Sequence, residues 1–517
     1  MRHEQTVPGE PLLDETNRIR GRVIASAGSL VASNAVGAIL SLVTIHLVAH
    51  TLGPPAYGEL TIIYSLGIML SLLADLGVSS VTTREIALQP ERAGALVGEA
   101  LGLRLVLCAA VLPILVGLGW IAYPRAHGVI ALGALIMGVD LYFNAILAIL
   151  QAYYTAQTRS VVPALLLVLS RVIYLLGALS ANLLRLPVLW IVISYAAGEG
   201  LAALIGLWLT SKRVRISLSI DLRAWWAVLI LSLPVGGMQV LARVYSRLDA
   251  ILLSLLKEPS VVAQYGIAYN FADVLTNLPS LLMVAVLPAL VADGPAPKFL
   301  ARFQGAFDVV VWLGAPIAMG GFVLRASIVS LVAGKGFAQA GGPLAVLILT
   351  VAISFPQVAF AWGCLTIGEY KGPFRVMLGV TGLNVVVNLL LIPPFGAMGA
   401  AWSQLISESI SLIAIAMLFS WRARVRVNYG MALRSVLVAG LVLASAQVAN
   451  RGWGFGNPLL RCSFGTAILG TEYVLLSIFG GSLPGEVLAL TTNIRGGARI
   501  AKLDLVAYLV KGLHHLR

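Results

Sequence analysis

The sequence predicts an all-α polytopic membrane protein with about 14 transmembrane helices. Hydrophobic residues make up 59% of the 517 residues and charged residues only 11%, whereas a soluble domain carries roughly 25% charged residues. Apolar runs recur along the whole chain, and each is long enough to cross a bilayer, which takes about 20 residues. A transmembrane β-barrel would instead show short segments of alternating hydrophobicity.

The apolar runs give the expected spans in order. We expect spans at 23–49, 60–82, 101–122, 128–156, 161–183, 187–210, 228–256, 261–290, 305–333, 343–367, 374–393, 396–420, 435–449 and 462–483. The thirteenth run is short, and the fourteenth contains Glu472. The connections between spans are also short, so they leave no room for a catalytic domain outside the membrane.

Basic residues predict the orientation of these spans. With the N-terminus in the cytoplasm, the cytoplasmic segments carry 24 of the 35 Lys and Arg residues, and the outer segments carry six. Cytoplasmic loops of membrane proteins collect Lys and Arg. The bias therefore predicts a cytoplasmic N-terminus and an even number of spans. It also explains much of the net charge of +13 without a nucleic-acid partner.

Three segments lie outside the spans. Residues 1–22 are polar and are expected to form a cytoplasmic N-terminal tail. Residues 211–227 mix basic residues with Ile, Leu and Trp, which is typical of an amphipathic helix at the membrane surface. This segment falls midway through the first twelve spans, where a linker between two halves is expected. Residues 485–517 alternate basic and apolar residues and are expected to form an amphipathic cytoplasmic tail.

An internal repeat relates the two halves of the chain. Leu52–Ser65 joins spans one and two, and Leu256–Asn270 joins spans seven and eight. With a one-residue insertion the two segments align, and Tyr64 then pairs with Tyr269 at an offset of 205 residues. The offset covers six spans, an even number, so both halves keep the same orientation. Transporters with parallel repeats have this arrangement, and their substrate sites lie between the halves near the middle of the membrane.

Four segments carry a resemblance to a known family. They are His50–Glu59 with the nearby Leu73–Gly77 and Arg84–Ala87, then Tyr245–Leu253, then Gly334–Pro343, and finally Asn388–Ala401. These segments resemble the polysaccharide and oligosaccharide flippases, of the type that acts on lipid-linked O-antigen, in the multidrug/oligosaccharidyl-lipid/polysaccharide exporter superfamily. The likeness runs from span one to span twelve and covers most of the chain.

The resemblance implies two pseudo-symmetric six-helix lobes around a central cavity. Spans one to six form the N-lobe at 23–210, and spans seven to twelve form the C-lobe at 228–420. A C-terminal helix pair at 421–484 resembles the extra pair of the lipid II flippase branch. Span one, however, has no Arg-Asp pair of the kind that branch uses, which argues against a peptidoglycan precursor as the substrate.

The same resemblance implies an activity and a location. The protein would move an undecaprenyl-pyrophosphate-linked oligosaccharide from the inner to the outer leaflet of the bacterial inner membrane by alternating access. This step would serve the biosynthesis of a cell-surface polysaccharide such as the O-antigen of lipopolysaccharide. The expected partners are the lipid-linked glycan, the bilayer and polysaccharide-assembly membrane proteins, and we expect neither a cofactor nor a metal.

Three arginines at membrane depth are the expected ligands of the diphosphate. Placing a charge in the bilayer costs at least about 2.5–3.5 kcal/mol, so such residues usually face a cavity or a partner. Arg171, Arg243 and Arg247 carry forked donor groups that match phosphate oxygens and do not lose their charge. The alternative is that internal ion pairs, such as Arg171 with Glu199 or Arg247 with Asp249, satisfy them.

Other polar residues at membrane depth are candidates for supporting roles. Asn270, Asn384 and Asn388 could bind sugar hydroxyls, although hydrogen bonds between helices are the commoner use of such residues. Asp140 and Glu199 are candidates to bind H⁺ or Na⁺ for coupling, and ion pairing to arginine is the alternative.

These observations predict a transporter and not an enzyme. A cation-coupled multidrug exporter of the same superfamily is the first alternative. Its cationic substrates would need unpaired acids in the cavity, whereas a diphosphate needs free arginines. A polytopic glycan polymerase or glycosyltransferase is the second alternative. Such enzymes usually place catalytic groups on a substantial outer loop, which this chain lacks.

Overall fold

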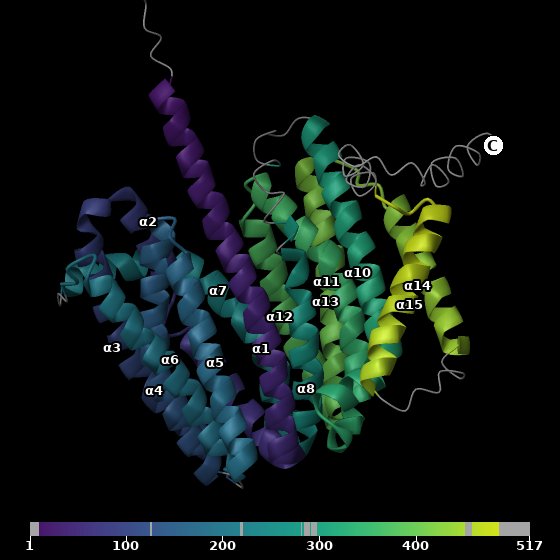
Figure 1. Ribbon diagram of the computed structural model, residues 1–517, viewed down its shortest axis with the longest axis horizontal. Coiled ribbons are helices and arrows are strands. Elements are labelled where there is room, and N and C mark those ends of the chain that lie inside the picture. Colours follow the sequence, from purple (N-terminus) through teal and green to yellow (C-terminus); the bar gives the residue numbers. More distant parts are fainter. Residues whose placement is uncertain are drawn as a thin grey trace, which may run out of the picture. The chain divides into compact units, whose positions relative to one another are not determined.

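The computed structural model describes residues 10–124, 127–217, 221–280, 282–283, 290, 297–449 and 458–484, and no strand occurs among them. The α-helices, shown in Figure 1, are α1 (Glu10–Ser71), α2 (Val78–Leu88), α3 (Ala93–Ile121), α4 (His127–Ala156), α5 (Val161–Leu184), α6 (Val188–Ser211), α7 (Leu222–Leu256), α8 (Pro259–Thr276), α10 (Pro297–Val332), α11 (Gly341–Thr366), α12 (Lys371–Phe395), α13 (Ala397–Ala423), α14 (Gly430–Ala449) and α15 (Pro458–Phe479). Two short 3₁₀ helices, η1 (Pro90–Arg92) and η2 (Lys335–Ala340), precede α3 and α11.

Ten helices among the described residues are long and apolar enough to cross a membrane. The count becomes eleven when the two limbs of α7, Leu222–Leu233 and Gly236–Leu256, are taken as one span bent by 59°. The all-helical, multi-pass class is therefore confirmed, whereas the expected number of 14 is not. The apolar part of α14, Gly430–Ala446, is shorter than a full span.

Helix α1 contains the first expected run, 23–49, and the first part of the second, 60–82, which continues across a break into α2. Its first arm follows α5 in the same direction, because Gly37 packs against Leu167 and Thr51 donates a hydrogen bond to Asn182 (3.1 Å).

The chain then turns back at Gly53, where the backbone leaves the helical region with φ of 67°. Glycine adopts this conformation without strain, and two prolines follow that start the next helical turn. Beyond the turn, Tyr64 lies at Tyr174, further back along α5 (3.1 Å between the hydroxyl oxygens). The two arms of α1 therefore run in opposite directions, which matches two expected spans joined by a short loop.

The chain divides into two compact units. Unit 1 consists of Met1–Asn277, Leu324–Thr350 and Lys371–Ala414, and unit 2 consists of Leu278–Val323, Val351–Tyr370 and Ile415–Arg517. This division follows helix contacts and differs from the lobe boundaries expected at 23–210 and 228–420. Those boundaries stay a prediction.

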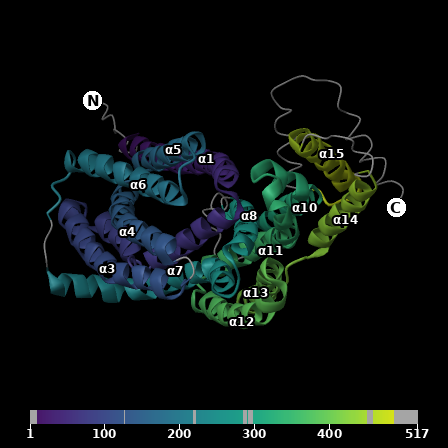
Figure 2. The same ribbon diagram turned by 90° about the horizontal axis from the view of Figure 1, so that it is seen from below.

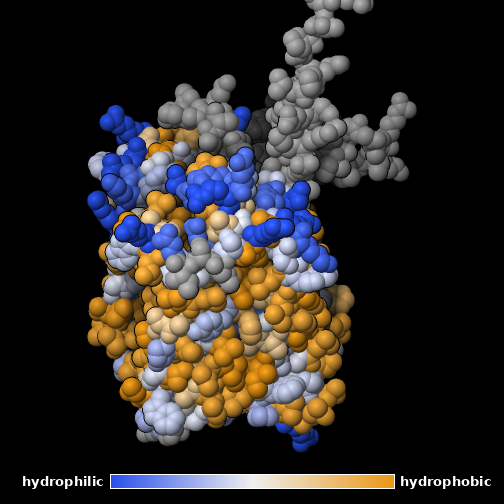
Figure 3. All heavy atoms as spheres, turned by 90° about the vertical axis from the view of Figure 1, so that its left-hand side faces the viewer, coloured by the Kyte–Doolittle hydropathy of each residue, from blue (hydrophilic) through white to orange (hydrophobic). Residues whose placement is uncertain are grey.

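Unit 1 is built from closely packed helix pairs. Helix α3 packs on α4, α5 on α6, α1 on α5, and α4 on α6, as Figure 2 shows. A cluster of buried residues, including Val78, Val97, Tyr154 and Trp225, joins α2, α3, α4 and α7. On the face of this unit seen in Figure 3, hydrophilic side chains gather at one end and a broad hydrophobic band lies below them. This distribution is what a bilayer requires of a spanning surface.

The segment expected as an amphipathic linker at 211–227 is only partly separate. Helix α7 begins at Leu222, because the side chain of Asp221 accepts hydrogen bonds from the backbone N–H groups of Arg223 (2.9 Å) and Ala224 (3.2 Å). An aspartate in this N-cap position satisfies donors that the first turn leaves unpaired. Trp225 is buried in the core of unit 1. The tail expected at 485–517 lies outside the described residues, as do the first nine residues of the N-terminal tail.

The two repeat segments pack directly against each other within unit 1. A Cβ added to Gly58 would collide with the carbonyl group of Pro259, and one added to Gly266 would lie 2.8 Å from the side chain of Thr61. Thr61 and Gly266 occupy equivalent places in the repeat. A contact between equivalent residues is expected on a pseudo-twofold axis, so the structure supports the internal symmetry that the sequence predicts.

Unit 2 has an aromatic core and carries the C-terminal helices. The rings of Phe303 and Phe419 stack at 4.5 Å between centroids, and Phe360 packs against both. Helices α14 and α15 lie side by side (Figure 1). The Tyr473 hydroxyl of α15 donates to the carbonyl oxygen of Trp312 in α10 (3.1 Å), which joins the last described helix to α10.

Candidate functional site

A cavity of about 680 Å³ in unit 1 is the candidate site, and we call it the arginine cavity. Its charged lining residues are Asp75, Arg104, Arg171, Arg243 and Arg247. Its volume lies within the range of roughly 300–1,000 Å³ that is typical of ligand sites. All three arginines that the sequence singles out therefore line one cavity.

Arg171 projects from α5 and lies over the ring of Tyr195 on α6, with 5.7 Å between the guanidinium carbon and the ring centroid. Tyr195 belongs to a trio of tyrosines with Tyr64 and Tyr174, whose rings meet at 5.2–6.4 Å. The face of an aromatic ring attracts a cation, so the tyrosine orients the guanidinium without neutralising it.

Arg243 and Arg247 project from α7, four residues apart, and residues at this spacing lie on one helix face. Arg243 is exposed, and Arg247 is half-buried over the ring of Tyr269, at 5.3 Å from its centroid. Among the residues that the structure describes, no carboxylate lies within the 4.0 Å ion-pair distance of Arg171, Arg243 or Arg247. The ion pairs considered as an alternative for Arg171 and Arg247 are thus not formed in this part of the chain.

Arg104 is the cavity arginine that the sequence reasoning did not single out. Only 1% of its surface is exposed. Its guanidinium lies 3.4 Å from a carboxylate oxygen of Asp75, donates to the Ser79 hydroxyl (3.1 Å), and reaches the carbonyl oxygens of Ala74 (3.4 Å) and Ala145 (3.3 Å). A charged residue inside the third apolar run was the available signal, but nothing in the sequence showed which arginine would be paired.

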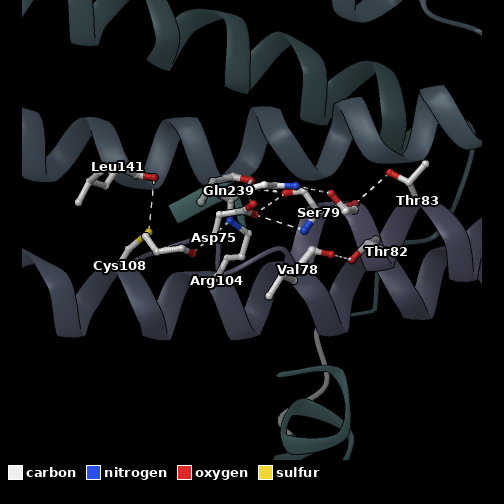
Figure 4. A network of polar contacts seen from close by, with 12 residues as sticks. Asp75, Val78, Ser79, Thr82, Thr83, Arg104, Cys108, Leu141 and Gln239 are labelled. Carbon is white, nitrogen blue, oxygen red and sulfur yellow. Dashed lines mark hydrogen bonds and ion pairs between the residues drawn. The ribbon is translucent and has the colours of Figure 1, made fainter. Parts of the chain in front are cut away.

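The Asp75–Arg104 pair stabilises a break between α1 and α2, which Figure 4 shows from close by. Between the two helices, Leu76 has φ of 44° and Gly77 has φ of 82°. Positive φ is strained for leucine, and such strain needs support from its surroundings. Asp75 provides that support because its Oδ1 accepts from the backbone N–H (3.3 Å) and the hydroxyl (2.6 Å) of Ser79 in the first turn of α2.

This break packs against the bend of α7. A Cβ on Gly77 would lie 2.6 Å from the backbone nitrogen of Gly236, and one on Gly236 would collide with the carbonyl group of Leu76. Nearby, the Gln239 amide of α7 donates to the Ser80 hydroxyl of α2 (3.0 Å). Two interrupted helices therefore meet through their backbones beside the cavity.

Asp140 and Glu199, the coupling candidates, lie inside unit 1 close to Arg171. Asp140 is 4% exposed, and its Oδ1 has no hydrogen-bond partner among the described residues. Glu199 is buried and accepts from the Asn144 amide (3.4 Å). The two carboxyl groups are close enough to interact electrostatically with each other and with Arg171. Glu199 also lines a smaller cavity of about 260 Å³ that shares Arg171 and Asn144 with the arginine cavity.

The three candidate asparagines do not line the arginine cavity as the structure describes it. Asn270 donates to the Tyr57 hydroxyl (3.3 Å). Asn384 and Asn388 are completely buried. The Asn388 amide donates to the carboxylate of Asp249 (2.6 Å) and to the side chain of Asn384 (2.9 Å). The observed contacts are the hydrogen bonds between and within helices that the sequence analysis kept as the alternative.

Comparison with known proteins gives the family and the fold. The sequence profile of the polysaccharide biosynthesis protein family matches residues 23–292, more than half of the chain. No curated protein matches the sequence at a significant level.

Two solved structures match most of the chain. The lipid II flippase MurJ, in an inward closed conformation, has 15% sequence identity and a TM-score of 0.72, and the match covers 88% of this chain and 98% of that one. An inward-facing multidrug resistance transporter of the MATE family has 14% identity and a TM-score of 0.63, covering 77% of this chain and 99% of that one.

A third match is a transporter of the MOP superfamily, to which the MATE family also belongs. It comes from Pyrococcus furiosus, with 14% identity, a TM-score of 0.52, and coverage of 78% of this chain and 95% of that one. At these identities the structural likeness establishes the fold alone. The expected family resemblance is confirmed: this chain belongs to the polysaccharide biosynthesis protein family and has the fold of MOP superfamily flippases and transporters.

Proposed function

We propose that this protein is a flippase that moves a polyprenyl-pyrophosphate-linked oligosaccharide from the inner to the outer leaflet, for the biosynthesis of a cell-surface polysaccharide. One observation carries the proposal above the others: Arg171, Arg243 and Arg247 line a single cavity without a carboxylate ion pair among the described residues. A diphosphate supplies the negative charge that these guanidinium groups lack, and arginine forks match its oxygens.

The charge of the cavity favours this substrate over a cationic drug. Four arginines line it, and Asp75 is the one carboxylate among its described lining residues. That carboxylate already pairs with Arg104. Asp140, Glu199 and Asp273 lie near enough to interact electrostatically with these arginines, but none of them lines the cavity or forms an ion pair with Arg171, Arg243 or Arg247. A cation in the cavity would therefore lie nearest to the guanidinium groups, and like charges repel. The Pyrococcus furiosus transporter is described as having a binding pocket of reverse polarity that suggests a different function, so pocket charge varies within this fold.

The family to which the chain belongs supports the glycan part of the proposal, because its members are polysaccharide biosynthesis proteins. The lipid II flippase shares the fold and acts on a lipid-linked substrate by its name. By analogy, the diphosphate and the glycan pass through the cavity while the polyprenyl chain stays in lipid. A glycan polymerase or glycosyltransferase would need a catalytic site. The Ser79 hydroxyl does donate to the Asp75 carboxylate in this cavity (2.6 Å), but that carboxylate pairs with Arg104 and holds the α1–α2 break, so we assign it a structural role and not that of a catalytic base.

Alternating access is the proposed mechanism. The repeat segments of α1 and α8 are in contact at Gly58 and Thr61, while the α1–α2 break meets α7 at Gly77. Each contact joins the two halves of the repeat, and the halves must separate at one contact before the cavity can open there. We propose that Asp140 and Glu199 couple this motion to H⁺ or Na⁺, because a buried carboxylate with an unpartnered oxygen gains from binding a cation.

The bias of basic residues supports a cytoplasmic N-terminus, and the proposed polyprenyl-linked substrate would place the protein in the bacterial inner membrane. Substrate would then enter from the cytoplasmic side, where lipid-linked glycans are built, and leave toward polysaccharide-assembly membrane proteins on the outer side.

The test is translocation of an undecaprenyl-pyrophosphate-linked oligosaccharide in reconstituted vesicles, read by access of a membrane-impermeant sugar-modifying reagent. Arg243→Ala should slow translocation at least about tenfold, because a hydrogen bond to a charged group contributes about 1.5–3 kcal/mol. Arg159→Ala, at an exposed arginine outside the cavity, should leave it unchanged. Equal rates for Arg243→Ala and the unsubstituted protein would refute the role of the cavity arginines.

A further inference from the structure

The arginine cavity has a second polar wall that the diphosphate does not explain. Ser71 at the end of α1, Asp75 in the break that follows, and Ser79, Ser80 and Thr83 of α2 contribute to this wall. Gln239 contributes from α7. Figure 4 shows Asp75, Ser79 and Gln239 close together. Apart from the paired Asp75, these groups are uncharged, so they offer hydrogen bonds without the positive potential that attracts phosphate.

Asp75 keeps acceptor capacity after its structural role is met. All three of its observed contacts, two from Ser79 and one from Arg104, use the same oxygen, Oδ1. No described residue donates a hydrogen bond to Oδ2. The side chain is 12% exposed and lines the cavity. A carboxylate held this way can accept a hydroxyl group from a ligand, because an ionised carboxylate accepts through both oxygens.

Gln239 and Ser80 add groups of the complementary kind. One N–H of the Gln239 amide donates to the Ser80 hydroxyl (3.0 Å), which leaves the second N–H and the carbonyl oxygen for a ligand. Thr83 donates its own hydroxyl to the Ser79 carbonyl (2.9 Å) and can still accept. Every hydroxyl of a sugar both donates and accepts, so a wall that presents donors and acceptors together fits a sugar ring.

From these contacts we infer that Asp75, Ser80 and Gln239 form a subsite for the sugar that is bonded directly to the diphosphate. The inference rests on the proposed function and deepens it, because it assigns the part of the cavity that reads the glycan. The sugar and the diphosphate share a covalent bond, so a diphosphate held by Arg171, Arg243 and Arg247 places the first sugar in the same cavity. The carboxylate of Asp75 would repel a phosphate oxygen, which keeps the diphosphate on the arginines.

The experiment compares the affinity of the purified protein for undecaprenyl pyrophosphate without a sugar and for lipids that bear one sugar. The sugar-bearing panel contains a hexose, an N-acetylhexosamine and a deoxyhexose. The unsubstituted protein should prefer at least one of these lipids over the sugar-free lipid. Gln239→Leu, which removes the amide at similar size, should lower that preference about threefold to tenfold, as expected for one or two lost hydrogen bonds.

Three further variants make the result specific. Asp75→Asn should lower the preference in the same way, and Ser80→Ala should do so to a smaller extent. Arg243→Gln should weaken binding of all the lipids by a similar factor and keep the preference, since it acts on the diphosphate. Gln89→Leu replaces an exposed glutamine outside the cavity and should change neither quantity.

The outcomes separate this inference from the proposed function. If the unsubstituted protein binds none of the lipids, the proposed function is wrong and the subsite is wrong with it. If it binds them all and Gln239→Leu and Asp75→Asn leave the preference unchanged, the flippase proposal stands and the sugar subsite is refuted. Because Gln239→Leu leaves the buried Arg104 pair intact, the test does not depend on how well Asp75→Asn folds.

Discussion

Substitution of Arg104 by methionine is the sharpest test of how the α1–α2 break is held. Methionine keeps most of the apolar stem and removes the guanidinium, which is 1% exposed and contacts Asp75, Ser79 and two carbonyl oxygens. The change leaves the Asp75 carboxylate, whose side chain is only 12% exposed, without its cation. Breaking a buried ion pair by removal of one partner costs about 3–5 kcal/mol.

This cost corresponds to a fall of roughly two to three and a half orders of magnitude in the folding equilibrium, since each 1.4 kcal/mol is a factor of ten. A double-mutant cycle separates the ion pair from the loss of packing. Asp75→Asn alone should also destabilise, because it leaves Arg104 uncompensated. The combination of Asp75→Asn with Arg104→Met removes both charges and should recover at least about 2 kcal/mol relative to the sum of the single changes.

The assay is unfolding by sodium dodecyl sulfate in mixed micelles, followed by loss of helical circular dichroism, for the unsubstituted protein and the three variants. Arg159→Met, at an exposed arginine, is the matched control and should change the free energy of unfolding by less than about 0.5 kcal/mol. Two results would refute the reasoning: an Arg104→Met protein as stable as the control, or single changes whose effects simply add.

Three more outcomes follow from the structure. A disulfide between Thr61→Cys and Gly266→Cys, which replace residues in contact across the repeat, should block translocation until a reductant is added; activity in the oxidised protein would show that this contact does not open. Glu199→Gln should remove the response of translocation to an imposed H⁺ or Na⁺ gradient while lipid affinity stays within about twofold, and a preserved response would exclude Glu199 from coupling. Asn388→Leu leaves the Asp249 carboxylate with fewer donors, so we expect a lower melting temperature and unchanged lipid affinity, whereas lost affinity without lost stability would show direct sugar contact.

Much of the fold was accessible from the sequence because a bilayer imposes a simple rule on composition. The turn at Gly53 could be predicted, since a glycine and two prolines interrupt an apolar run at the place where a loop was needed. The start of α7 at Leu222 was missed. The basic and aromatic residues there match a surface helix equally well, and only the structure shows that Trp225 enters a core.

The candidate site was predictable in its charges and not in its hydrogen bonds. Arg171, Arg243 and Arg247 stand out because a charge is rare in an apolar run, and the structure places all three on one cavity. Asn384 and Asn388 stand out for the same reason but lie in a buried network. Depth along a helix can be read from sequence, whereas the direction of a side chain around the helix axis depends on neighbours that come from distant parts of the chain.

The cavity arginines also show how a membrane protein can hold a guanidinium group at depth without a directly bound carboxylate. Arg171 lies over the ring of Tyr195, and Arg247 lies over the ring of Tyr269. Tyr269 is the repeat counterpart of Tyr64, and Tyr64 packs against Tyr195. A carboxylate partner would stabilise each guanidinium and also occupy the donors that a phosphate needs. An aromatic face stabilises the cation by about 0.5–2 kcal/mol and leaves the donors at the edge of the guanidinium available.

One arginine of this kind comes from each half of the repeat, so a diphosphate that contacts both gains affinity only while the halves hold them close together. A ligand can shift a conformational equilibrium only by the difference in its affinity for the two states. A bound diphosphate would therefore favour the conformation in which the two arginines lie close together over the conformation in which they are apart. The rings of Tyr195 and Tyr269 make this possible, because they stabilise the guanidinium groups and leave the N–H donors for the diphosphate.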